Sequence, residues 1–282
     1  MDGIILIDKE KGYTSRDVVN IISKKLNTKK VGHFGTLDPL ATGLLVIGVG
    51  KYTKAQVLFN EKKKYEVEIL LGKKYDTYDI TGNLIEEEKI NEVDFEKLKD
   101  IILSFKKSYL QEVPIYSAVK VNGKKLYEYA RNNISLKENL PKKEVSIFSI
   151  DNISLIKKDD DFYITFDTLV SKGTYIRSLI NDISKKSNIS MTMSNLRRTN
   201  IDLFDVSNKD VLNVKDDLFF IDIDKYIDYK RVEIPSLLEK KIMNGNKIDN
   251  IFEEERIVFT KNNKNIVLYE KDNFVMRPIF FF

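Results

Sequence analysis

Two kinds of apolar pattern divide this chain into strands and helices. Continuous apolar runs at residues 4–7 and 44–49 predict buried strands, and the second run is apolar enough to be covered on both faces. From residue 64 to residue 72 apolar and polar residues alternate, which predicts a strand with Tyr65 on its apolar side. Two further strands, paired with each other, are expected at residues 145–156 and 162–170.

Helical spacing of apolar residues appears in four segments. A capping box at residues 14–17 opens the first helix, in which Val18, Ile22 and Leu26 recur on one face. Asp94 is placed to cap a second helix, which carries apolar residues as far as residue 105. Shorter helices are expected at residues 126–131 and 176–184.

The last part of the chain differs from the rest. Short apolar segments at residues 257–260, 266–270 and 274–281 are separated by polar turns rich in Asn and Lys, which is typical of a small β-rich domain. We therefore predict two domains, residues 1–224 and 225–282. The chain shows neither regular βαβ alternation nor an internal repeat, so the predicted fold class is α+β.

The charge balance adds a weak indication of an anionic partner. The 282 residues include 47 Lys and Arg against 43 Asp and Glu, a net charge of +4. Residues 1–75 carry 14 of the basic residues and 8 of the acidic ones, so the surplus lies in the first quarter. A basic region of this kind suits nucleic acid, although lysines on a Lys-rich chain often serve only solubility.

Two scarce residue types exclude several kinds of chemistry. The chain has no Cys, which excludes disulfides, thiolate metal sites and a cysteine nucleophile. It has one His, which excludes a zinc site built from several histidines, so no metal site is expected. The first eight residues are too short and too acidic for a signal peptide, and no apolar run is long enough to span a membrane. We expect a soluble, cytoplasmic protein.

The segment from Val31 to Gly43 is the strongest candidate for a functional site. It places Asp38 in a loop between glycines, near the only histidine of the chain, His33. Pro39 biases Asp38 toward an extended backbone, and the glycines allow another backbone or a ligand to approach closely. An isolated Asp-Pro would be read as a turn, but other segments of the chain also carry candidate chemistry.

Three other segments contribute candidate side chains. Tyr65 has a flat ring that could stack on a base, although most tyrosines on an apolar face are core residues. Tyr175 and Arg177 are two residues apart where a strand gives way to a helix, so both could reach one pocket. Leu196 adjoins the arginine pair at 197–198, and guanidinium groups suit phosphate.

Together these segments resemble the TruB family of tRNA pseudouridine synthases. The likeness covers roughly residues 3–200, and the order and spacing of its blocks make a chance match remote. The matching blocks are the loop Gly32–Gly43, the opening Asp8–Ser15, the DTYDITG segment Asp76–Gly82, the PIYSAVK segment with its sequel through Arg131, and SKGTYIR from Ser171 to Arg177.

The resemblance implies a fold and a reaction. The fold is a mixed, largely antiparallel sheet flanked by helices, followed by a small C-terminal PUA-like domain. The reaction is the isomerisation of a uridine in the T loop of tRNA, at position 55, to pseudouridine. The implied partner is the T stem-loop of tRNA, with no protein partner and no membrane, and with a monomer as the default state. A role in tRNA folding is compatible with the same scaffold.

The resemblance also implies roles for individual residues. Asp38 is the implied catalytic carboxylate, Arg177 the arginine that pairs with it, and Tyr65 the ring that stacks on the flipped base. Tyr65 could also assist the final loss of the proton from C5. The residues implied to bind the substrate are His33, Tyr65, Tyr175 and Leu196.

The implied chemistry explains why no cofactor is expected. The N1–C1′ bond is cut, the uracil turns, and a C5–C1′ bond forms, with no net redox change and therefore no expected cofactor. A carboxylate in a poorly hydrated pocket needs a nearby cation, which Arg177 fits. The residues allow three roles for Asp38: attack on C1′, attack on C6, or removal of a proton from the sugar.

The chain departs from the family pattern at four places, none of them in the Asp38 loop or in SKGTYIR. Prolines of the pattern are replaced by Glu10 and Val113, a common Ala-His by Met191-Thr192, and a glycine by Asp202. The contacts with RNA near residues 190–204 are therefore expected to differ from the pattern.

Three other functions compete with this one. A non-catalytic RNA-binding module or folding chaperone would make Asp38 expendable, and a related enzyme could act on a different RNA uridine. A nucleotide hydrolase is suggested by the segment 48–53, but Leu45 stands where the phosphate loop requires a glycine, and Tyr52 where it requires Ser or Thr.

Overall fold

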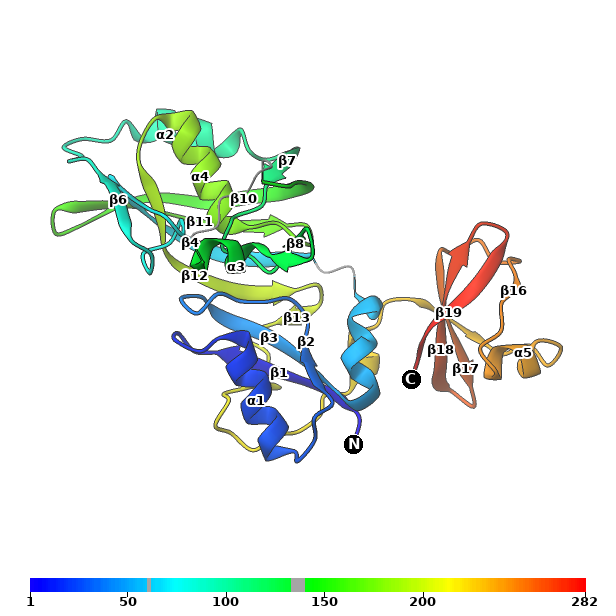
Figure 1. Cartoon of the computed structure of the whole chain (residues 1–282). Helices are drawn as coiled ribbons and strands as arrows, with labels where there is room; N and C mark the ends of the chain where they lie inside the picture. Colours follow the sequence, from blue (N-terminus) through cyan, green and yellow to red (C-terminus); the bar gives the residue numbers. More distant parts are fainter. Residues whose placement is uncertain (60–61, 133–139) are drawn as a thin grey trace.

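One large mixed sheet organises most of the molecule (Figure 1). The computed structural model describes residues 1–59, 62–132 and 140–282. Within this part the large sheet has ten strands, in the order β14-β1-β3-β12-β4-β11-β10-β7, with β2 beside β3 and β13 beside β12. Most neighbours are antiparallel; β1 with β14 and β3 with β12 are parallel. The strands are β1 (Gly3–Lys9), β2 (Val31–His33), β3 (Thr42–Val49), β4 (Lys63–Leu71), β7 (Ser108–Glu112), β10 (Lys142–Lys158), β11 (Asp161–Val170), β12 (Met191–Ile201), β13 (Phe204–Asp205) and β14 (Val211–Leu212).

Helices and two small hairpins complete this part of the chain. The hairpins are β5 (Lys73–Tyr75) with β6 (Leu84–Glu87) and β8 (Lys120–Val121) with β9 (Lys124–Lys125). The helices are α1 (Ser15–Lys25), α2 (Phe95–Leu103), α3 (Leu126–Arg131), α4 (Ile176–Ser187) and the 3₁₀ helices η1 (Gly50–Leu58) and η2 (Ile223–Tyr226). The predicted α+β class and the mixed, largely antiparallel sheet with flanking helices are confirmed.

The apolar runs in β1 and β3 are continuous because both faces of these strands are buried. In β3, Leu45 and Ile47 point into the core on the α1 side of the sheet, whereas Leu44 and Val46 point into a second core on the opposite side. Strands covered on both faces lose the alternation of polar and apolar residues. By contrast, the alternating residues of β4 face the first core, as their pattern predicts: Tyr65, Val67, Ile69 and Leu71.

The capping box predicted at the first helix is present. Thr14 accepts a hydrogen bond from the backbone N–H of Asp17, and the Asp17 carboxylate accepts from the backbone N–H of Thr14. Two N–H groups that the helix leaves unpaired are satisfied in this way. Asp94 likewise caps α2 by accepting from the N–H of Lys97.

A second sheet forms the C-terminal part of the chain. Its five strands are ordered β15-β17-β18-β19-β16, and we call them, with α5, the C-terminal sheet. These elements are β15 (Lys230–Glu233), β16 (Ile248–Asp249), β17 (Arg256–Lys261), β18 (Lys264–Asp272), β19 (Val275–Phe281) and α5 (Glu239–Met243). The expected β-rich C-terminal region is confirmed.

The C-terminal sheet packs against the face of the large sheet that is opposite α1. One core lies within the C-terminal part, and its members include Phe259 and Tyr269. The second core, on the side of β1 and β3 away from α1, is shared between the large sheet and the C-terminal sheet. Val258, Leu268 and Phe280 pack there with residues of η1. In the part of the chain that is described, no helix has the length and apolar character needed to span a membrane.

Candidate active site

The loop that carries Asp38 is fixed on both sides of that residue. The Ser15 hydroxyl at the start of α1 accepts from the Leu37 N–H at 2.8 Å and donates to the Leu37 carbonyl at 3.1 Å. On the other side, the N–H of Gly12 donates to the Pro39 carbonyl at 2.8 Å. The sequence between β1 and α1 therefore serves to hold the backbone around Asp38 in place.

A buried arginine ties the two ends of the same loop together. Arg198 on β12 is fully buried and donates to the carbonyls of Gly35, Thr36 and Leu44 at 3.1, 3.4 and 2.8 Å. Gly43 packs against its backbone with φ +99°, and a Cβ there would lie 2.2 Å from the Arg198 carbonyl oxygen. Only glycine fits at such a position.

The interpretation of the arginine pair at 197–198 as a phosphate-binding group is wrong for Arg198. Its guanidinium is occupied by backbone carbonyls inside the protein. Arg197 is bound in a two-point pair with Asp8, at 3.0 and 2.7 Å. The sequence showed two adjacent cations, but it did not show that β12 is an inner strand of the sheet, which buries one of them.

Replacing Arg198 by methionine should destabilise the protein. The change keeps much of the apolar stem but leaves the buried Leu44 carbonyl and the partly buried carbonyls of Gly35 and Thr36 without their donor. We expect the free energy of unfolding to fall by about 2–4 kcal/mol, the usual cost of buried polar groups that lose a charged partner. Urea unfolding followed by circular dichroism measures this, and an unchanged midpoint would contradict the structural role of Arg198.

Asp38 and Arg177 form a two-point ion pair. Arg177, at the N-terminal end of α4, donates from Nε to Asp38 Oδ2 at 2.9 Å and from Nη2 to Oδ1 at 3.0 Å. Arg177 is 5% exposed, whereas the Asp38 side chain is 32% exposed. The pair therefore presents the carboxylate to the pocket and keeps the guanidinium behind it, in the planar arrangement that only arginine provides.

Other groups hold the guanidinium in this position. Arg177 also donates to the backbone carbonyls of Thr77 and Tyr116, both at 3.1 Å. A second carboxylate, Asp79, lies 3.9 Å from Arg177 Nε and is 5% exposed. Asp79 itself accepts hydrogen bonds from Thr77 and Thr81.

The sequence did not single out Asp79 as a site residue. Asp79 lies in the DTYDITG segment, which contributed only a matching block to the resemblance. Its signal was a carboxylate between two threonines and close to a glycine, which is the composition of a loop folded around an Asp side chain.

Tyr65, Tyr175 and Leu196 join Asp38 and Arg177 around one pocket of about 480 Å³. Tyr65 and Leu196 are 6% and 5% exposed and approach from the neighbouring strands β4 and β12. Burial raises the pKa of Tyr175 above 10.0, so its hydroxyl stays protonated at neutral pH. The structure thus brings together five of the six residues predicted to form the site.

His33 lies outside the lining of this pocket. It ends β2 and is partly buried, and its Nδ1 has no hydrogen-bond partner within the described residues. Burial, followed by the positive charge of Arg198, lowers the pKa of His33 below 6.5. The imidazole is therefore neutral at pH 7.

The single histidine permits a direct test of this environment. In an NMR titration its imidazole signal should change with a midpoint below pH 6.5. As the pH falls below 6.5, the unfolded chain binds a proton at His33 before the folded chain does. The free energy of unfolding therefore decreases over that range. A midpoint at or above 6.5 would contradict the buried environment of the ring.

Lys9 is a second buried cation close to the Asp38 loop. It is fully buried and donates to the carbonyls of Glu10 and Tyr13, at 3.0 and 2.7 Å. Burial lowers the pKa of Lys9 to about 8, although the negative charge of Asp38 acts in the opposite direction. Lys9 thus shapes the turn that contains Gly12, whose N–H holds Pro39.

Comparison with known proteins places the chain in a family. Residues 23–176 match the model described as TruB family pseudouridylate synthase, N-terminal domain. A protein of Mesoplasma florum named tRNA pseudouridine synthase B is 38% identical over 278 residues, covering 96% of this chain and 94% of that protein. A protein of the same name from Acholeplasma laidlawii is 48% identical over 205 residues, which cover 72% of this chain and 71% of that protein.

Solved structures agree on the fold. A crystal structure of a Cbf5–Nop10–Gar1 complex contains a chain that matches with a TM-score of 0.65 and 22% identity, covering 95% of this chain and 78% of that one. A structure of an H/ACA RNP bound to a substrate RNA containing 2′-deoxyuridine matches with a TM-score of 0.64 and 20% identity, with coverages of 99% and 83%. At these identities the likeness concerns the fold alone.

The family match covers both the loop of Asp38 and the segment that leads into Arg177. Sequence, fold and pocket therefore define the class of this protein as a pseudouridine synthase. Within that class the chain belongs to the TruB family of pseudouridylate synthases, and the resemblance seen in the sequence is confirmed.

Proposed function

We propose that this protein isomerises uridine 55 in the T loop of tRNA to pseudouridine. The observation that carries the proposal is the two-point pair between Asp38 and Arg177, which opens onto the pocket lined by Tyr65. In this proposal Asp38, Tyr65 and Arg177 are the catalytic residues. The residues that bind the substrate are His33, Tyr65, Tyr175 and Leu196.

The pocket suits a base that has left its stack. A flipped uracil loses its stacking partners at a cost of a few kcal/mol, and an aromatic side chain recovers part of this. Tyr65 provides such a ring and Leu196 an apolar contact, next to the exposed side of the Asp38 carboxylate.

The reaction balances without any other reactant. The N1–C1′ bond breaks, the C5–C1′ bond forms, C5 loses its proton, and N1 gains one. Asp38 acts where the sugar joins the base, and the Arg177 fork keeps both carboxylate oxygens in one orientation. Arg177 also places a positive charge directly behind the carboxylate, where the bound base excludes water from the pocket.

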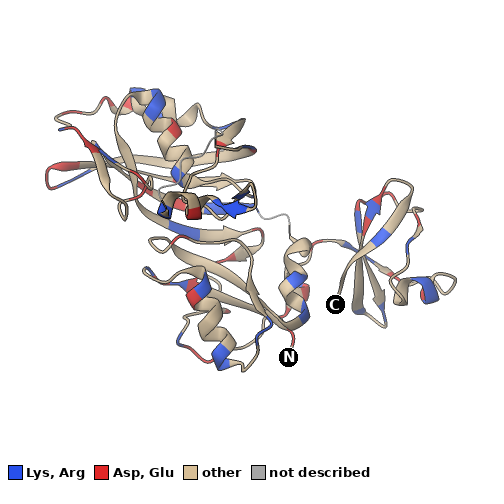
Figure 2. Ribbon diagram, viewed as in Figure 1, with Lys and Arg blue, Asp and Glu red and all other residues tan. Residues whose placement is uncertain are grey.

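Basic elements around the pocket support RNA as the substrate (Figure 2). The hairpin of β8 and β9 carries Lys120, Lys124 and Lys125, and η1 carries Lys51 and Lys54. The relatives named tRNA pseudouridine synthase B support tRNA in particular. Phosphate contacts from such lysines would position the RNA without reading its sequence.

The proposal extends to the organisation of the protein. Residues 1–224 would form the catalytic domain and residues 225–282 a PUA-like domain, which is supported by a separate sheet with a core of its own. We take the protein to act as a monomer in the cytoplasm, on the T stem-loop of tRNA.

The substrate is tested by mapping pseudouridines in tRNA from a strain that lacks the protein. Uridine 55 should remain unmodified there, and the purified protein should convert it in an unmodified tRNA transcript. Release of tritium from 5-tritiated uridine measures the conversion. If position 55 is still modified in the deletion strain while another uridine is not, the assigned position is wrong.

A further inference from the structure

The strand β7 is bonded to the beginning of α4, the helix that carries Arg177. The N–H of Tyr175, which directly precedes α4, donates to Gln111 Oε1 on β7 at 2.8 Å. One turn further along the helix, Ser178 Oγ donates to the backbone carbonyl of Glu112, also at 2.8 Å. Arg177 lies between these two contacts, so β7 fixes the segment of backbone from which its side chain extends.

The Gln111 side chain is itself held at both ends of its amide. Gln111 is 1% exposed, and its Nε2 donates to the Tyr109 hydroxyl at 2.8 Å. That hydroxyl donates in turn to Asp182 Oδ2 on α4 at 3.2 Å. Burial, followed by the negative charge of Asp182, raises the pKa of Tyr109 above 10.0, so the hydroxyl keeps the proton that it donates.

These bonds form a chain that begins and ends on α4. It runs from Tyr175 through Gln111 and Tyr109 to Asp182, about two turns further along the helix. Because the amide oxygen and the amide nitrogen have different partners, the Gln111 side chain fits in one orientation only. A buried polar network with all its members paired makes its surroundings rigid. Gln111 does not line the pocket that holds Asp38, so any effect on the reaction passes through other residues.

We infer that Gln111, oriented by Tyr109, is a positioning residue for the reaction. It holds the start of α4 so that the Tyr175 ring and the Arg177 fork meet the Asp38 carboxylate. The inference rests on the proposed function, and it gives a role to a residue outside the pocket. Without the Gln111 side chain the Tyr175 N–H has no acceptor on β7, and the first turn of α4 can move. A displacement of about 1 Å at reacting groups can lower a rate by about 10²-fold.

Gln111→Met tests the inference, because methionine has a similar length and no group that can accept from Tyr175. The single-turnover rate of tritium release should fall by about 30-fold, and tRNA affinity should stay within about twofold. In the Arg177→Lys background the same change should lower the rate by less than about twofold, because both changes act on one ion pair. If the two losses multiply instead, Gln111 does not act through Arg177 and the inference is wrong.

Tyr109→Phe is a milder variant with a matched control. It removes the bonds to Gln111 and Asp182 but keeps the ring, and the rate should fall by about fivefold. The control is Tyr269→Phe, because the Tyr269 hydroxyl donates to the Asn246 carbonyl at 2.7 Å within the C-terminal sheet. The control should lose a similar amount of stability and keep its rate. Equal rates in the two variants, measured where circular dichroism shows both to be folded, would overturn the inference.

The Arg177 side chain provides a readout that does not depend on the reaction. Its Nε–H group, which is bonded to Asp38, should give a nitrogen–proton NMR signal that is identified by its loss in Arg177→Lys. The signal should shift in Gln111→Met and stay in place in Tyr269→Phe. An unmoved signal in Gln111→Met would contradict the positioning role, whichever uridine is converted. If the signal and the rate change as expected but the converted uridine is not number 55, the proposed substrate is wrong and the role of Gln111 stands.

Discussion

Asp38→Asn should abolish pseudouridine formation and leave tRNA binding within about twofold of the unchanged protein. The amide cannot act as a nucleophile or as a base, and its NH₂ group would face the N–H donors of Arg177 instead of accepting from them. Removal of a catalytic group lowers turnover by about 10⁴-fold or more in well-studied enzymes. Tritium release under single-turnover conditions measures the rate, and filter binding measures the affinity.

The chain contains a matched control for this change. Asp8 is also 32% exposed and is also bound at both oxygens by an arginine, Arg197, but it does not line the pocket. Asp8→Asn should lower stability modestly and keep most of the turnover. Wild-type turnover in Asp38→Asn would remove Asp38 from its catalytic role. An equal loss in both variants would point to a general effect of breaking an Asp–Arg pair.

Local patterns in the sequence predicted most elements of the fold. The continuous apolar run at 44–49 indicates a strand buried on both faces, and the alternation from residue 64 to residue 72 indicates a strand with one apolar face. The structure has β3 and β4 at these positions, with burial of this kind. The capping box at residues 14–17 marks the start of α1 because it depends only on adjacent residues. Features of this kind can be predicted from neighbouring residues, without knowing which distant residues they contact.

The site itself depends on contacts that local patterns do not contain. Asp38 and Arg177 are 139 positions apart, and only the resemblance to a family placed them together. Arg198 bonds to carbonyls more than 150 positions away, so its buried role was not visible beside the similar Arg197. A charged residue in a sequence is read as exposed by default, and an inner strand reverses that expectation.

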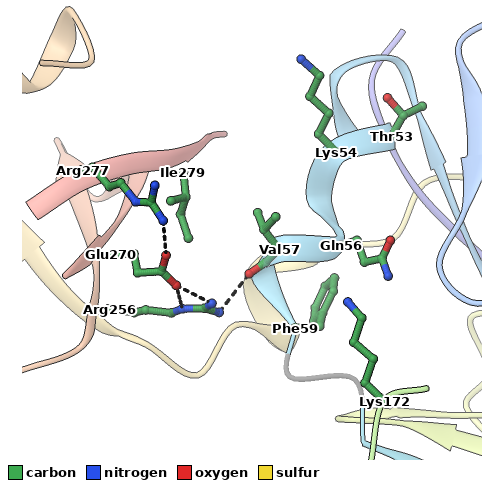
Figure 3. Close-up of a pocket in the computed structure, with 10 residues that line it drawn as sticks. All are labelled: Thr53, Lys54, Gln56, Val57, Phe59, Lys172, Arg256, Glu270, Arg277 and Ile279. Carbon is green, nitrogen blue, oxygen red and sulfur yellow. Dashed lines mark hydrogen bonds and ion pairs between the residues drawn. The ribbon is translucent and has the colours of Figure 1, made fainter. Parts of the chain in front are cut away.

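A groove of about 710 Å³ between η1 and the C-terminal sheet (Figure 3) was also not predictable from the sequence. It depends on how the C-terminal sheet packs against η1, through the shared core behind β3 and the contact of Arg256 with Val57. The C-terminal segment has nearly balanced charges along its sequence, so its composition gave no reason to expect a basic groove there. The fold collects basic side chains from separate segments onto one surface.

Arg177→Lys should lower turnover by about 10²- to 10³-fold, with tRNA binding changed by less than about threefold. Lysine keeps the charge, but its single ammonium cannot reach both oxygens of Asp38 and the two carbonyls that Arg177 also binds. The carboxylate would then rotate in the pocket, and catalysis is sensitive to such misplacement. Single-turnover rates and filter binding measure the two effects separately.

Arg197→Lys provides the control, because Arg197 forms the same kind of fork with Asp8 on another part of the sheet. Both variants should lose some thermal stability, which is followed by circular dichroism, but only Arg177→Lys should lose turnover at a temperature where both are folded. If Arg177→Lys instead weakens tRNA binding and keeps the rate of the bound complex, Arg177 contacts the RNA backbone and does not orient Asp38. The ratio of the two effects in this one variant therefore decides whether the guanidinium acts on the carboxylate or on the substrate.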